Sequence, residues 1–129
     1  MNTPFQILLI EDNPDHAFLA RRELKKCGLP IEMSHAENST VALDWLREHL
    51  PDLILLDIKL PGRDGFELLI LLKADERTRD IPVVLLTSSP SPSDIERATR
   101  LGAASYFTKP LQAESIKGIL EQLVPVAKG

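Results

Sequence analysis

The sequence predicts an α/β fold in which five parallel strands form one doubly wound sheet. Short apolar runs at residues 7–10, 53–56 and 83–86 are continuous rather than alternating, which is the pattern of parallel strands covered on both faces. Longer segments with helical spacing separate these runs. Strands that alternate with helices favour right-handed crossovers within one sheet. The expected architecture is therefore five βα units in a single domain, with a core at about residues 6–125 of the 129.

The helix after the first strand has recognisable start and stop residues. Asn13 is expected to cap it, Pro14 suits its first position, and Gly28 is expected to end it after two lysines. A weaker strand is predicted at residues 31–36. These signals fix the first βα unit and the start of the second.

The remaining elements follow from the same patterns. A second helix is expected to begin at Asn38 or Ser39 and to be stopped by Pro51. Further helices are predicted at residues 65–74, 93–101 and 113–124, with the fifth strand at residues 104–108. Together they complete the five units.

Composition narrows the classes of function. Charged residues make up 26% of the chain and the net charge is −4, so no broad basic surface is expected and nucleic acid is not predicted as a direct partner. Cys27 is the single cysteine and cannot form an internal disulfide. No apolar run approaches the roughly 18–20 residues that cross a bilayer, and the start of the sequence does not resemble a signal peptide. We expect a cytoplasmic protein without an output domain.

Polar residues are predicted at the carboxyl ends of the strands, where open parallel sheets bind their ligands. They are Glu11 and Asp12 after the first strand, Asp57 after the third, Thr87 and Ser88 after the fourth, and Thr108 and Lys109 after the fifth. A single Asp or Lys at a strand end is usually a loop residue or a helix cap. The joint pattern, with each residue at its expected topological place, favours a common site.

The residue types indicate a phosphoryl chemistry. Crowded carboxylates repel one another, and a hard divalent cation such as Mg²⁺ can hold several of them together through their oxygens. A cation beside Asp57 would neutralise an incoming phosphoryl group, so that this carboxylate could act as the nucleophile. The ammonium of Lys109 would attract the same phosphoryl group.

Four segments resemble the signature stretches of response-regulator receiver domains: ILLIEDNP, PDLILLDIKLPGRDG, IPVVLLTSS and GAASYFTKP. They occur in the expected order and cover nearly the whole chain. The resemblance implies the flavodoxin-like (βα)5 receiver fold, with Asp57 as the phosphoacceptor and Asp12 as a direct Mg²⁺ ligand. Glu11 would support the metal through its hydration shell, and the main-chain carbonyl of Lys59 would complete the protein ligands.

The same resemblance assigns the phosphoryl contacts and a switch. Thr87 would bond a phosphoryl oxygen, Lys109 would pair with the phosphoryl group, and Pro110 would follow a cis peptide bond. Tyr106 matches the aromatic switch position that is coupled to the Thr87 hydroxyl in this family. The implied function is to accept a phosphoryl group from a sensor histidine kinase, with only self-catalysed phosphotransfer and autodephosphorylation as activities.

A narrower resemblance concerns the partner. The segments EDNP and KADERTRDIPVVLLTSS are similar to stand-alone regulators paired with cyanobacterial and bacterial phytochrome kinases, which suggests a bacteriophytochrome as the kinase. Output would reach an unknown downstream protein, or a further phosphorelay step, through the face formed by the fourth helix, the fifth strand and the fifth helix. The apolar stripe of the fifth helix adds a homodimer on this face as a hypothesis. The stripe consists of Ile116, Ile119, Leu120, Leu123 and Val124.

Two other classes of protein share part of this pattern. A phosphatase of the haloacid dehalogenase type also forms an aspartyl phosphate, but it carries a second Asp two residues after the nucleophile, where this chain has Lys59. A flavodoxin-like module that binds a nucleotide or a flavin would need a glycine-rich phosphate loop, whereas the first βα loop here carries Asp12, Asn13 and Pro14.

Overall fold

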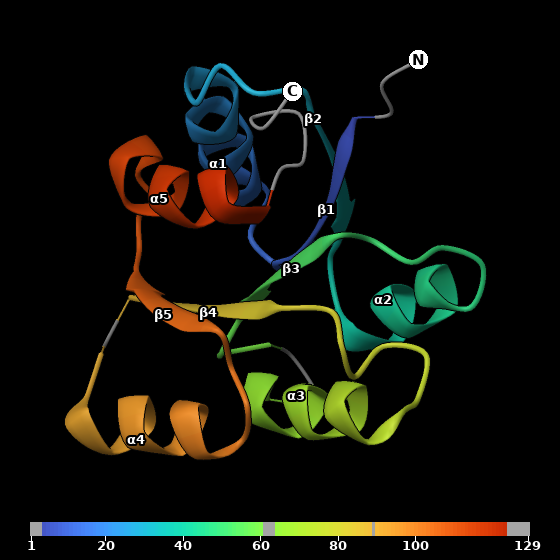
Figure 1. The fold of residues 1–129 in the computed structure, drawn as a ribbon. Coiled ribbons are helices and arrows are strands. Elements are labelled where there is room, and N and C mark those ends of the chain that lie inside the picture. Colours follow the sequence, from blue (N-terminus) through green and yellow to red (C-terminus); the bar gives the residue numbers. More distant parts are fainter. Residues whose placement is uncertain (1–3, 61–63, 89, 124–129) are drawn as a thin grey trace.

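A computed structural model describes residues 4–60, 64–88 and 90–123 of the chain (Figure 1). Five strands alternate with five helices along these residues. The strands are β1 (Phe5–Ile10), β2 (Ile31–Ala36), β3 (Leu53–Asp57), β4 (Val83–Thr87) and β5 (Ser105–Thr108). The helices are α1 (Pro14–Lys26), α2 (Ser39–Leu46), α3 (Gly65–Ala74), α4 (Pro92–Arg100) and α5 (Ala113–Leu123). The predicted alternation is confirmed.

All five strands are parallel and form one sheet in the order β2-β1-β3-β4-β5. Helices α1 and α5 cover one face, and α2, α3 and α4 cover the other (Figure 1). A separate apolar cluster fills each interface. Because the chain moves to one side of β1 for β2 and to the other side for β3, the winding reverses at β1 and β3. The carboxyl ends of these two strands are the place where such a sheet binds ligands.

The capping residues predicted for α1 are present in the structure. The Asn13 side chain accepts hydrogen bonds from the main-chain N–H groups of Asp15 and His16, and Pro14 occupies the first turn. Gly28 follows the helix with a φ of 71°, the left-handed conformation that glycine adopts most easily. Helix α1 therefore holds a fixed position beside the end of β1.

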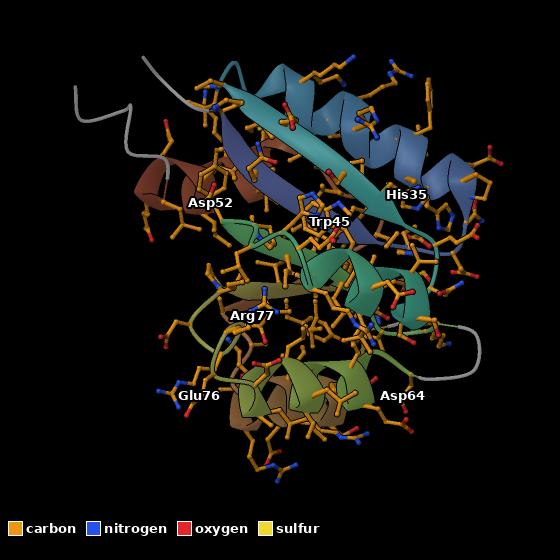
Figure 2. All side chains as sticks on the ribbon, turned by 90° about the vertical axis from the view of Figure 1, so that its right-hand side faces the viewer. His35, Trp45, Asp52, Asp64, Glu76 and Arg77 are labelled. Carbon is orange, nitrogen blue, oxygen red and sulfur yellow. The ribbon has the colours of Figure 1, made fainter. Side chains whose placement is uncertain are left out.

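Helix α2 ends earlier than the sequence predicts. Its last residue is Leu46, whereas the proline expected to stop it is Pro51. The turn after the helix tightens, since the N–H groups of Arg47 and Glu48 bond to carbonyls three residues earlier. Arg77 also donates from Nη2 to the carbonyl of Leu46 at 2.9 Å. This contact ties the end of α2 to the connection that follows α3 (Figure 2).

The apolar stripe of α5 lies mostly in the core. Ile116 and Leu120 are fully buried, while Ile119 and Leu123 are partly buried and pack against the same cluster. Val124 lies outside the described residues. The stripe thus serves mainly to hold α5 on the sheet, and it lends the predicted homodimer less support than its width suggested.

Candidate functional site

The site lies at the carboxyl ends of the strands. In Figure 2, His35 at the end of β2 and Asp64 before α3 lie at this end of the sheet, and Asp52 before β3 lies at the opposite end. His35 donates from Nε2 to the carbonyl of Glu11 at 2.7 Å, and the Glu11 N–H bonds to the carbonyl of Ala36 at 3.0 Å. These bonds fix the main chain at the end of β1, where Glu11 and Asp12 follow the strand.

Three carboxylates converge at this place. Glu11 and Asp57 are buried, with 2% and 5% of their surface exposed, and Asp12 is exposed. Each offers a carboxylate oxygen, and the three oxygens lie within 4.8 Å of one another. The predicted metal ligands therefore meet, although their residues come from two strands that are far apart in the sequence.

Lys109 connects two of these carboxylates. Its Nζ lies 2.5 Å from Oε1 of Glu11 and 3.0 Å from Oδ2 of Asp57, and only 11% of its side chain is exposed. The N–H of Lys109 bonds to the carbonyl of Thr87 at 2.7 Å, which anchors the end of β5 to the end of β4. The peptide bond between Lys109 and Pro110 is cis, as predicted.

The electrostatics of the cluster are asymmetric. Burial is the largest influence on Glu11 and raises its pKa, the charge of Asp57 adds to this, and the hydrogen bond from Lys109 only partly opposes it. For Lys109, burial lowers the pKa, but the hydrogen bonds and charges of Glu11 and Asp57 outweigh burial, so the pKa is raised. Lys109 therefore stays charged, whereas its hydrogen bond to Glu11 does not fully offset the effect of burial on the Glu11 carboxylate.

This donor set fits a hard cation. Carboxylate oxygens are the ligands that Mg²⁺ prefers, and an exposed residue such as Asp12 leaves room for the water ligands that this ion keeps. Glu11 and Asp57 share the single positive charge of Lys109, and a divalent cation would supply the further positive charge that two buried carboxylates need. The main-chain N–H of Lys59 donates to Oδ1 of Asp57 at 3.2 Å. The proposed role of the Lys59 carbonyl as a metal ligand stays a prediction.

The two residues of the predicted switch lie on neighbouring strands. Thr87 ends β4 and is buried, and Tyr106 is in β5. The Tyr106 hydroxyl is buried and makes no well-formed hydrogen bond within the described part of the chain. Burial is the main cause that raises the pKa of Tyr106, and the charge of Asp94 adds to it. The nearby Thr87 hydroxyl and the main chain of Ser91 lower this pKa, but by less. The tyrosine thus points inward beside Thr87.

Three further residues shape the site and were not predicted to do so. Asn13 donates its main-chain N–H to Oε2 of Glu11 at 3.1 Å, besides capping α1. His16 places Nδ1 3.2 Å from Nζ of Lys109. Gly65 brings the start of α3 against the end of β3, with its N–H bonded to the carbonyl of Ile58. Asn13 and Gly65 have local signals in the sequence, whereas the contact of His16 spans 93 residues and leaves none.

The raised pKa of Glu11 predicts a pH-dependent stability. A carboxyl whose folded pKa exceeds its ordinary value of 4.5 binds more protons in the folded than in the unfolded state. From pH 4.5 up to the folded pKa, its contribution to stability therefore falls as pH rises. Urea unfolding with EDTA present should show the wild type losing stability relative to Glu11→Gln across this window. Parallel pH profiles for the two proteins would contradict the burial argument.

Among the described residues, no helix is long and apolar enough to cross a membrane.

Comparison with known proteins agrees with this geometry. A sequence model described as the response regulator receiver domain matches residues 7–121. The probable methanogenesis regulatory protein FilR2 of Methanothrix harundinacea is 42% identical over an alignment of 126 residues. The alignment covers 93% of this chain and 81% of FilR2. The phosphorylated cyanobacterial phytochrome response regulator RcpA has a TM-score of 0.82 at 32% identity, with 96% of each chain covered. A second similar structure is the receiver domain of sensor histidine kinase PA1611 from Pseudomonas aeruginosa, which was solved with a magnesium ion in its active-site cleft. Its TM-score is 0.81 at 26% identity, and the match covers 94% of this chain and 98% of that chain.

The fold and the acidic site define a receiver, a domain that accepts a phosphoryl group in two-component signalling. This chain belongs to the family of response regulator receiver domains. Members of the family receive phosphate from histidine kinases and are phosphoacceptors rather than enzymes with a separate substrate. The resemblance found in the sequence is thereby confirmed.

Proposed function

We propose that this protein accepts a phosphoryl group on Asp57 from a sensor histidine kinase in a Mg²⁺-dependent reaction. The single observation that supports this most is the position of the Asp57 carboxylate. It is buried at the end of β3, 3.0 Å from the Lys109 ammonium and within reach of two further carboxylates that can share a cation. Nucleophile, counter-charge and metal ligands then occupy one small site.

Each residue has a distinct task in the proposed reaction. An oxygen of Asp57 forms the new bond to phosphorus as the P–N bond to the phosphohistidine of the kinase breaks. Asp12, Asp57 and the main-chain carbonyl of Lys59 would hold Mg²⁺, Glu11 would support it through its hydration shell, and the bound cation would neutralise charge on the phosphoryl group. Lys109 pairs with the transferred group, and the Thr87 hydroxyl donates to one of its oxygens. Slow hydrolysis of the same bond would return the protein to its resting state.

The test is phosphorylation by acetyl phosphate, a small donor that needs no docking surface. Intact-mass measurement should show one added phosphoryl group in the presence of Mg²⁺ and none with EDTA. The group should be labile in hydroxylamine, as an acyl phosphate is, and peptide mapping should place it on Asp57. A stable phosphoryl group, or one on another residue, would contradict the proposal.

Asp12 provides a separate prediction about the metal. Since a ligand that binds only the folded state raises its stability, Mg²⁺ should raise the thermal unfolding midpoint of the wild type. Asp12→Ala removes a charged ligand, so the increase with Mg²⁺ should shrink at least severalfold, while stability in EDTA stays nearly unchanged because Asp12 is exposed. Asp15→Ala, which removes an exposed carboxylate in the first turn of α1, is the control. An equal Mg²⁺ effect in wild type and Asp12→Ala would remove Asp12 from the site.

The proposed output surface is formed by α4, β5 and α5. Only Ala98 of α4 is buried, and Ile95 is 44% exposed, so this helix has few anchors and can shift at little cost. Phosphorylation adds about −1.5 to −2 charges beside Thr87 and Tyr106, and their rearrangement would move this surface. A downstream protein, a further phosphorelay step or a second copy of the chain would respond to it. Sedimentation with and without beryllofluoride tests the homodimer.

The identity of the kinase is the narrowest part of the proposal. RcpA is a phytochrome response regulator, and its likeness to this chain supports a phytochrome-type histidine kinase as the phosphodonor. Incubation with a panel of autophosphorylated kinases, followed by comparison of transfer rates, tests this choice. Fastest transfer from a kinase without a phytochrome sensor would contradict it.

A further inference from the structure

We propose that His16 is a positioning residue for phosphoryl transfer, because its imidazole accepts a hydrogen bond from the Lys109 ammonium and holds that group over Asp57. The proposal rests on phosphorylation of Asp57 as the function. It concerns a residue of α1 that the proposed reaction does not otherwise use. The contact joins the first turn of α1 to the end of β5.

The contacts of Lys109 account for all of its donors. An ammonium has three N–H groups and no acceptor. Nζ of Lys109 lies 2.5 Å from Glu11 Oε1, 3.0 Å from Asp57 Oδ2 and 3.2 Å from His16 Nδ1. Because Lys109 can only donate, Nδ1 must accept with its lone pair. The distance from Nδ1 to Glu11 Oε1 is longer, at 3.8 Å, so the lysine is the partner of the histidine.

The position of His16 is itself fixed by the start of α1. Its main-chain N–H donates to the Asn13 side chain at 3.3 Å, and the main-chain N–H of Asn13 donates to Glu11 Oε2 at 3.1 Å. The contacts thus close a ring from Glu11 through Asn13 and His16 to Lys109 and back to Glu11. The cap therefore fixes the main chain of His16, from which the imidazole reaches Lys109.

The three acceptors of Lys109 differ in what happens to them during the proposed reaction. Glu11 and Asp57 would help to hold the cation, and Asp57 would also receive the phosphoryl group. His16 takes part in neither event, so it is the acceptor that stays the same throughout. His16 therefore holds the Lys109 ammonium near the site while the two carboxylates bind the cation and the phosphoryl group. Less entropy is then lost when the ammonium is oriented toward the phosphoryl group.

The test compares variants in their reaction with acetyl phosphate and Mg²⁺ and in their affinity for beryllofluoride. His16→Ala should slow phosphorylation and weaken beryllofluoride binding by about three- to tenfold each, the effect of one partly exposed hydrogen bond to a charged donor. His16→Gln, which can keep an acceptor, should recover most of this loss. Phe18→Ala is the control, since Phe18 lies on the same helix and is 60% exposed.

A double-mutant cycle with Lys109→Met shows whether the histidine acts through the lysine. His16→Ala should have no further effect on beryllofluoride affinity when Lys109 is already replaced. An equal effect in both backgrounds would overturn the proposal, and so would a His16→Gln variant as impaired as His16→Ala. A third measurement needs no reaction: the ammonium protons of Lys109 should exchange with water faster in His16→Ala than in wild type.

The outcomes separate this inference from the proposed function. If the wild type takes up no phosphoryl group and binds no beryllofluoride, both proposals fail. If the wild type does both and His16→Ala matches it, Asp57 remains the phosphoacceptor and only the role of His16 is overturned.

Discussion

Asp57→Asn is expected to abolish phosphorylation by both acetyl phosphate and the kinase. The amide lacks the negative oxygen that attacks phosphorus, and it also removes one charge from the cation site. Intact-mass measurement should find no added phosphoryl group under conditions that fully modify the wild type. Asp15→Asn is the matched control, because it makes the same chemical change at an exposed carboxylate in the first turn of α1.

The variant should fold normally, so that loss of phosphorylation reports on chemistry. Removing the Asp57 charge costs the ion pair with Lys109, but the lysine keeps Glu11 at 2.5 Å. The change also relieves the repulsion through which Asp57 raises the pKa of Glu11. Because these effects oppose each other, we expect the free energy of unfolding to stay within about 1 kcal/mol of the wild type. A phosphoryl group of the same lability on Asp57→Asn would show that the nucleophile is another residue.

The site was predictable from the sequence because its residues follow strands that are easy to recognise. The continuous apolar runs before Glu11, Asp57 and Thr87 are buried in the structure, and parallel strands bring their carboxyl ends to one edge. Lys109 follows the short strand β5, and its ammonium indeed reaches Asp57. The position of each residue at the end of a strand was therefore enough to predict that these side chains meet at one edge of the sheet.

What the sequence did not reveal depends on contacts between distant elements. The pairing of His16 with Lys109 requires a particular distance between α1 and β5, and no periodicity encodes that distance. The apolar stripe of α5 indicates which face is buried but not what covers it, and the structure assigns Ile116 and Leu120 to the core. The end of α2 at Leu46 likewise accepts a hydrogen bond from Arg77, which lies in another part of the chain.

Gly65→Ala should destabilise the protein strongly. A Cβ at this position would lie 2.5 Å from the carbonyl oxygen of Asp57 and 2.7 Å from Cα of Ile58, distances that real Cβ atoms essentially never show. Both atoms belong to the main chain of β3 and its continuation, so no flexible side chain can move aside. Helix α3 would have to shift away from the sheet. We expect a loss of about 3 kcal/mol in the free energy of unfolding, the upper end of the usual range for overpacking.

Gly118→Ala is the matched control, because it is the same substitution at a helical glycine with open space around it. Gly118 lies within α5 and is exposed, and nothing lies within 4 Å of a Cβ placed there. Alanine should therefore stabilise the protein by about 0.5–1 kcal/mol, since glycine loses more conformational freedom than alanine in a helix. Urea unfolding should give changes of opposite sign for the two variants. Equal stabilities would mean that α3 can withdraw from Asp57 freely, and the close approach at Gly65 would then have no part in holding the proposed phosphorylation site.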